Sequence, residues 1–165
     1  MHKRIGWGGA AVALGVTISG WVLAVQSVRP APDFPFSGMA YRQFLLVMLA
    51  EIALFTAFVL AGVLLRKRRE KHRAMMLLAT LSILAGATVR MPVLFSVFGE
   101  AGWTGIFGPI FVLGALFLLA RSVLTRRLDR PLATGYAVLV VFYVGACHFA
   151  VSDTWSYLSA AVFNT

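Results

Sequence analysis

The chain has 165 residues, 60% of them hydrophobic, whereas soluble domains average about 45–50%. Its 15 Lys and Arg outweigh six Asp and Glu, but they cluster between apolar runs without interleaved aromatic residues, which argues against nucleic-acid binding. The single cysteine, Cys147, excludes an intrachain disulfide and any CxxC metal or redox motif. This composition predicts a helical integral membrane protein.

Five apolar stretches match the roughly 20 residues needed to cross about 30 Å of hydrocarbon. They cover residues 5–28, 41–65, 74–98, 103–120 and 132–151. We therefore expect one membrane domain over residues 1–165, an all-α bundle of five transmembrane helices. Beyond them, Trp155 and Leu158 share a helical face within residues 153–163, which predicts a short helix in the outer interface.

The first stretch follows a basic start, a pattern shared by an uncleaved first helix and a secretory signal peptide cleaved near Ser27. We expect an uncleaved helix, because the apolar run exceeds the roughly 7–15 residues of a signal peptide. Ala11, Gly15 and Ser19 recur at a spacing of four, which predicts a face for close packing with a neighbouring helix.

The segment 29–38 contains three prolines and predicts an extended loop lying on the membrane surface. Phe34 and Phe36 would then dip into the interface. The alternative is that these two aromatic residues form a lid or an edge on which a partner docks.

The positions of Lys and Arg predict the orientation, because cytoplasmic segments retain positive charge. Twelve of the 15 lie in the N-terminal segment or in the segments 66–73 and 121–130. We expect the N-terminus inside, the C-terminus outside, and a multi-pass protein of the bacterial cell membrane. The basic loop 66–73 would also meet anionic lipid headgroups, with His72 solvated within it.

Two charged residues lie within apolar stretches, Glu51 in the second and Arg90 in the third. Counted from the centre of the basic loop at about 1.5 Å per residue, their Cα atoms differ in depth by about 3 Å. Helical side chains lean toward the N-terminus, so the two would lean toward each other. We expect an ion pair that either fixes helix register or lines a polar cavity for a proton, an ion or a small ligand.

His148 lies near the outer end of the fifth stretch, at a depth close to that of Glu51 and Arg90. It either joins their cluster or acts as an interfacial hydrogen-bonding residue. No second histidine lies within a span for bis-histidine haem ligation, and no catalytic or phosphate-binding motif occurs. We therefore expect no catalytic residues, no metal and no cofactor.

A basic loop ending in Lys71-His72-Arg73 opens a Met- and Leu-rich span (71–80, KHRAMMLLAT) with an arginine near its far end (87–92, ATVRMP). These segments and the ending SDTW (152–155) resemble a class of small uncharacterised bacterial polytopic membrane proteins. A further similarity is to the small assembly-type membrane proteins of haem-copper oxidases. The chain differs from such relatives in carrying Asp129-Arg130-Pro131 where they would show further histidines, which argues against a haem or copper role.

Two functions fit these observations. The first is a non-catalytic accessory or assembly subunit that packs against other membrane subunits through its small-residue faces. The second is a small transporter or ion-handling protein in which Glu51, Arg90 and His148 surround a polar site near the bilayer midplane.

Overall fold

The computed structural model describes residues 2–36, 38–91 and 101–163, with side chains for residues 8–36, 38–88, 91 and 101–161. Its helices are α1 (His2–Val28), α2 (Tyr41–Leu64), α3 (Arg69–Ile83), α4 (Ala85–Arg90), α6 (Trp103–Thr125), α7 (Arg130–Ala150) and α8 (Asp153–Phe163). A small antiparallel hairpin of β1 (Pro35–Phe36) and β2 (Met39–Ala40) precedes α2. The expected helical architecture is confirmed for the part of the chain described, apart from this hairpin.

Four helices within the described ranges are long and apolar enough to cross a membrane. They cover Gly8–Val28, Tyr41–Leu64, Trp103–Thr125 and Arg130–Ala150. The expected span over 74–98 is not among them, because its helix breaks after Ile83 and residues 92–100 lie outside those described. A fifth crossing therefore stays a prediction.

Three helix ends lie at polar or charged residues and not where the apolar runs begin or end. α3 starts at Arg69, ahead of the apolar run, with Glu70 in its first turn, where a negative charge is favourable. α6 continues to Thr125, and the next residue, Arg126, ends the helix by adopting the left-handed conformation (φ 53°). α7 starts just after Asp129, which caps it by accepting the Leu132 N–H at 3.2 Å.

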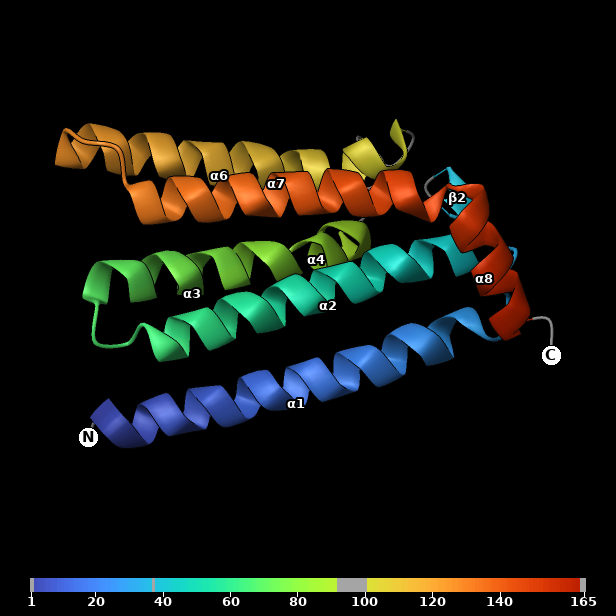
Figure 1. The fold of residues 1–165 in the computed structure, drawn as a ribbon, viewed down its shortest axis with the longest axis horizontal. Helices are drawn as coiled ribbons and strands as arrows, with labels where there is room; N and C mark the ends of the chain where they lie inside the picture. Colours follow the sequence, from blue (N-terminus) through green and yellow to red (C-terminus); the bar gives the residue numbers. More distant parts are fainter. Residues whose placement is uncertain (1, 37, 92–100, 164–165) are drawn as a thin grey trace.

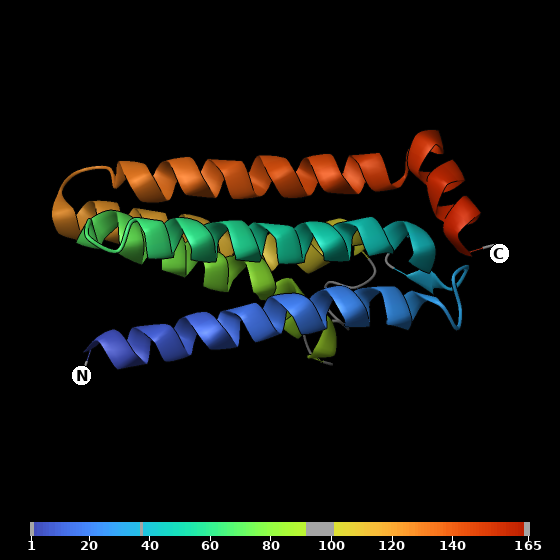
Figure 2. The ribbon, with the colours of Figure 1, turned by 60° about the horizontal axis from the view of Figure 1, so that its bottom comes forward.

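The long helices lie side by side along one axis, and the chain reverses at both ends of the bundle. Figures 1 and 2 show the N-terminal end of α1 together with the α2–α3 and α6–α7 loops at one end, and α8 at the other. The segments 66–73 and 121–130, which comprise these loops and the adjoining helix ends, carry ten of the 15 Lys and Arg, so positive charge gathers at the end that holds the N-terminus.

The core lies between α2, α3, α6 and α7. Its largest fully buried side chains include Tyr143, Phe107 and Leu78. Gly135 allows α7 to approach α3 closely, since a Cβ added there would overlap the Leu78 Cδ1 atom.

Helix α1 packs mainly on α2 and stands apart from the main core. The Thr17 and Thr56 hydroxyls share a hydrogen bond of 3.1 Å, and Gly20 lets Ile52 approach α1. Ala24 forms part of a small separate cluster with residues of α2. Most other side chains of α1 are exposed, which leaves much of its surface for lipid or for a partner.

The segment before α2 folds back instead of lying extended. The Arg42 guanidinium pairs with Asp33 at 3.1 Å, and the Phe36 ring packs edge-on against Phe44 with 4.8 Å between ring centroids. Phe36 therefore packs on α2, and the expectation that it dips into the membrane interface stays a prediction. Phe34 remains 56% exposed.

Candidate functional site

The third helical segment breaks at Leu84, in the middle of the bundle, between α3 and α4. In an uninterrupted helix the Ser82 carbonyl would accept the Gly86 N–H. Here the Gly86 N–H donates to Glu51 Oε1 of α2 at 3.2 Å, and the Ser82 carbonyl accepts the hydroxyl of Tyr143 from α7. Two side chains from neighbouring helices thus bind the backbone groups that meet at the break.

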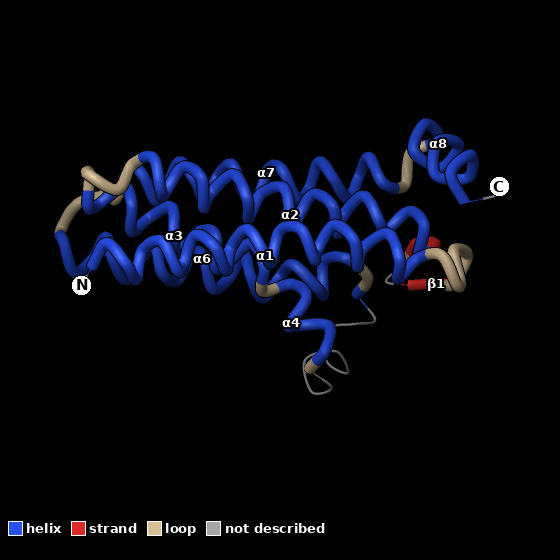
Figure 3. The backbone as a smooth tube through the Cα atoms, turned by 90° about the horizontal axis from the view of Figure 1, so that it is seen from below, coloured by secondary structure: helices blue, strands red, loops and turns tan. Residues whose placement is uncertain are grey.

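Local sequence favours an interruption at this place. The Ser82 hydroxyl donates back to the Ala79 carbonyl at 2.8 Å, and the Thr88 hydroxyl donates to the Leu84 carbonyl at 3.1 Å. Such back-bonding bends helices, and Gly86 adds a residue of low helix propensity. Figure 3 shows α4 turning away from the line of α3.

Tyr143 is the member of this cluster that sequence reasoning missed. It is fully buried, and its ring stacks on Phe107 at 4.5 Å. A tyrosine in the middle of an apolar span was the available signal, because a buried phenol needs a hydrogen-bond partner.

The three residues singled out from the sequence have different outcomes. Glu51 is half-buried and contacts the first turn of α4, the helix that ends at Arg90. The Arg90 side chain lies outside those described, so the ion pair stays a prediction. His148 is exposed on α7 and lies edge-on to the Trp103 ring of α6, with 5.9 Å between centroids.

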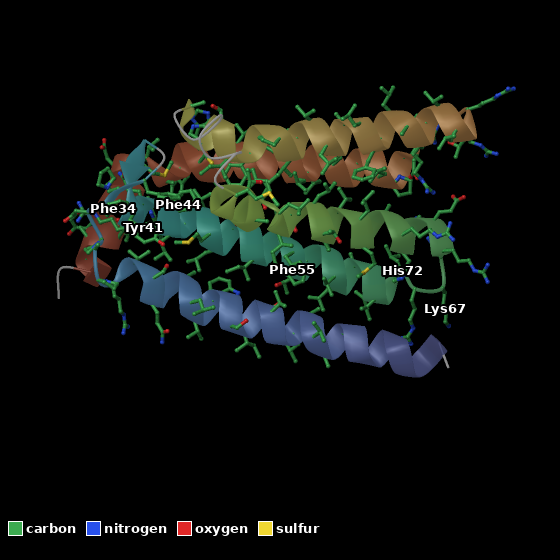
Figure 4. All side chains as sticks on the ribbon, turned by 180° about the vertical axis from the view of Figure 1, so that it is seen from behind. Phe34, Tyr41, Phe44, Phe55, Lys67 and His72 are labelled. Carbon is green, nitrogen blue, oxygen red and sulfur yellow. The ribbon has the colours of Figure 1, made fainter. Side chains whose placement is uncertain are left out.

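A groove of about 650 Å³ borders Glu51, and we call it the α1–α2 groove. Its walls come from α1, α2, the α3–α4 region and α6, and most of them are apolar. Figure 4 labels Tyr41, Phe44 and Phe55, three of the lining residues along α2. Glu51 and Gly86 are polar points partway along the groove, whereas Gln26, Ser27 and Tyr41 lie near its α8 end.

The basic end of the bundle is more ordered than expected. His72 is not simply solvated: its Nδ1 atom lies 2.7 Å from the Gly62 carbonyl and ties the start of α3 to the end of α2. Figure 4 shows His72 at this junction, with Lys67 on the loop beside it. At the second loop, the guanidinium of Arg121, which lies in the last turns of α6, pairs with Asp129, the residue that caps α7.

Within the described residues, no three His, Cys, Asp or Glu side chains lie close enough together to hold a metal ion. No family model, curated protein or solved structure matches the chain. The resemblance to small bacterial membrane proteins therefore stays a prediction. Four long apolar helices identify the chain as a multi-pass integral membrane protein.

Proposed function

We propose that the chain is a non-catalytic accessory or assembly subunit of the bacterial cell membrane, and that α1 packs against a transmembrane helix of another subunit. The observation that carries this proposal is the small-residue face of α1, consisting of Gly8, Ala11, Gly15 and Ser19. All four residues are exposed, and a Cβ at Gly8 or Gly15 would meet nothing within 4 Å.

This face points away from the rest of the bundle. At about 100° per residue, Gly15 and Ser19 lie about 160° around the helix from Thr17, which bonds to α2. Small residues at a spacing of four let two helix backbones approach closely, which drives association between transmembrane helices. A free face of this kind suits contact with a second protein.

The polar cluster at the helix break also supports a structural role. The Glu51 and Tyr143 side chains bind backbone groups of the third helical segment. In a bilayer such groups must find partners within the protein. Glu51 therefore helps to stabilise an irregular helix inside the membrane. This structural role accounts for the carboxylate without a transported substrate.

For the topology, we propose five crossings with the N-terminus inside and the C-terminus outside. The gathering of both basic loops at the N-terminal end supports this orientation, because positive segments stay cytoplasmic. The third crossing would consist of α3, α4 and the residues that follow. The same basic end would contact anionic lipid headgroups, and α8 would lie in the outer interface.

The test of the accessory role is the native mass of the protein purified in mild detergent from its own membrane. We expect a stoichiometric partner in the wild type, lost in Gly15→Leu and kept in the control Leu14→Phe, an exposed position about 100° away from Gly15. The proposal would be contradicted by a native mass that corresponds to a monomer, or to an oligomer of this chain alone whose mass is the same in both variants.

A second candidate is a small transporter or ion-handling protein, and the α1–α2 groove beside Glu51 favours it. The double change Glu51→Gln with Arg90→Met separates the two functions. A structural pair tolerates neutral replacements, so complex formation should survive in an accessory subunit. A transport site would instead lose flux, measured in proteoliposomes, while the protein still inserts.

A further inference from the structure

We propose that a pocket at the α6–α7 loop binds the phosphoethanolamine headgroup of a membrane lipid, with the phosphate on Arg127 and Arg130 and the ammonium on Glu70. This goes beyond a general contact between the basic end and anionic headgroups, because it assigns one site and a zwitterionic ligand. The ligand is a lipid and not a protein subunit, so failure of this proposal would leave the accessory role untouched.

The pocket, which we call the α6–α7 pocket, has a volume of about 800 Å³. Its walls come from the last turns of α6, the α6–α7 loop, the start of α7 and the first turn of α3. These segments meet at the end of the bundle that holds both basic loops (Figures 1 and 2). The Thr125 hydroxyl lies 2.8 Å from the Arg121 carbonyl oxygen and 2.9 Å from that of Arg127, so it links the end of α6 to the loop.

The charges that line the α6–α7 pocket do not all have partners within the protein. Arg121 pairs with Asp129, so these two neutralise each other. Arg127, Arg130 and Glu70 are exposed and form no salt bridge in the part of the chain that the structure describes. The pocket therefore offers two cations and one anion to a ligand.

This combination of charges favours a zwitterion. The planar guanidinium of arginine matches the oxygens of a phosphate, to which it forms charge-assisted hydrogen bonds. A ligand that carried only the phosphate would be repelled by the Glu70 carboxylate. A primary ammonium donates hydrogen bonds to a carboxylate, and phosphoethanolamine carries an ammonium and a phosphate on one short linker.

The start of α7 gives independent support for a phosphate. Arg130 is the first residue of α7, where a positive charge is unfavourable toward the helix dipole. Asp129 supplies the cap of this helix, so Arg130 is not needed to form it. The same dipole favours a phosphate at this end. Binding of an anion therefore explains the position of Arg130 better than helix stability does.

A lipid supplies this headgroup better than a soluble compound does, because the α6–α7 pocket borders an apolar surface. Leu128 lines the pocket and is 60% exposed. Leu124, which precedes the lining residue Thr125 in the last turn of α6, is 84% exposed. Acyl chains can lie against such side chains while the headgroup enters the pocket.

The experiment uses the full chain in mild detergent and counts bound dioleoyl lipids by native mass spectrometry. Phosphatidylethanolamine should bind at least about fivefold more tightly than phosphatidylcholine, whose trimethylated ammonium donates no hydrogen bond, or phosphatidylglycerol, which has no cation. Glycerophosphoethanolamine, the same headgroup without acyl chains, should compete only weakly. If it competed as well as the lipid, the pocket would belong to a soluble ligand and the proposal would be overturned.

Variants connect this preference to the pocket, and all the side chains changed are exposed. Glu70→Gln should bring phosphatidylethanolamine and phosphatidylglycerol to equal affinity, and Arg127→Gln with Arg130→Gln should weaken phosphatidylethanolamine binding about 20-fold. The control, Lys67→Gln with Arg68→Gln, removes the same charge from the other loop, outside the pocket, and should leave the preference unchanged. Equal binding of the three lipids, an unchanged preference in Glu70→Gln, or equal losses in the two double variants would show only general attraction of headgroups to the basic end and would overturn the proposal.

Discussion

Replacing Tyr143 by phenylalanine removes one hydroxyl and leaves the ring and its stacking on Phe107 in place. The Ser82 carbonyl, which accepts that hydroxyl at the helix break, then loses its donor. Both residues are fully buried, so water cannot easily replace the bond. We expect Tyr143→Phe to lower the free energy of unfolding.

The magnitude follows from the setting of the bond. Leaving a buried acceptor unsatisfied costs about 1–3 kcal/mol, and single side-chain hydrogen bonds between transmembrane helices average about 0.6 kcal/mol, with a maximum of about 1.7 kcal/mol. The bond supports a broken backbone in the core, so a value of about 1–2 kcal/mol is expected. This corresponds to about a 5- to 30-fold change in the equilibrium constant.

The assay is reversible unfolding in mixed micelles, with Tyr157→Phe as the matched control. Tyr157 is 78% exposed on α8, and its hydroxyl makes no hydrogen bond among the described residues, so its change should alter stability by less than about 0.5 kcal/mol. Amide hydrogen exchange adds a local measurement, since exchange should become faster around Ser82–Thr88 in Tyr143→Phe.

Two results would refute this reasoning. If Tyr143→Phe and Tyr157→Phe had the same stability, the Ser82 carbonyl would not depend on the phenol. If exchange at Gly86 became slower instead, the helix would have repaired itself by restoring the bond between the Gly86 N–H and the Ser82 carbonyl. Glu51 would then not be holding that N–H.

Three further predictions concern packing, capping and topology. Gly135→Val should cost about 1–3 kcal/mol in thermal unfolding because its side chain meets Leu78, whereas Gly145→Val, at a site open in all directions within 4 Å, should cost far less and so serves as control. Asp129→Ala should destabilise the protein by about 1 kcal/mol through loss of the α7 cap; Asp129→Asn, which still caps, should be milder, and equal losses would assign the effect to the Arg121 pair. In a Cys147→Ala background, a cysteine at Lys67 should react with a membrane-impermeant maleimide only after the membrane is opened, and one at Tyr157 should react in intact cells; the reverse pattern would invert the proposed orientation.

Much of the architecture could be predicted from the sequence. The runs around Tyr41–Leu64 and Arg130–Ala150 are each apolar over a length that spans a bilayer. Such a run is typical of a transmembrane helix, because a helix satisfies its own backbone hydrogen bonds in hydrocarbon. The two basic loops likewise predicted which ends of the helices would gather together. The break at Leu84 was not predicted, because the hydropathy of the third run is continuous there although its backbone is not. The crossing itself stays a prediction.

The candidate site was only partly predictable. Glu51 stood out as a charge within an apolar run, and the neighbouring helix does meet it, but through the Gly86 amide as far as the described residues show. Tyr143 passed unnoticed because a lone tyrosine in a span gives no sign of which helix it will face. His72 was misjudged for a similar reason, since its partner is the Gly62 carbonyl across the loop.

By itself, the sequence indicated a membrane protein, most of the segments that form its helices, and where its positive charge collects. These properties depend on how each short segment interacts with hydrocarbon or water, so local composition is sufficient. The local sequence favours a break in the third segment, but only the tertiary structure decided which side chains hold it. The two bonds there join residues 35 and 61 positions apart, and they depend on which faces of α2, α3 and α7 meet.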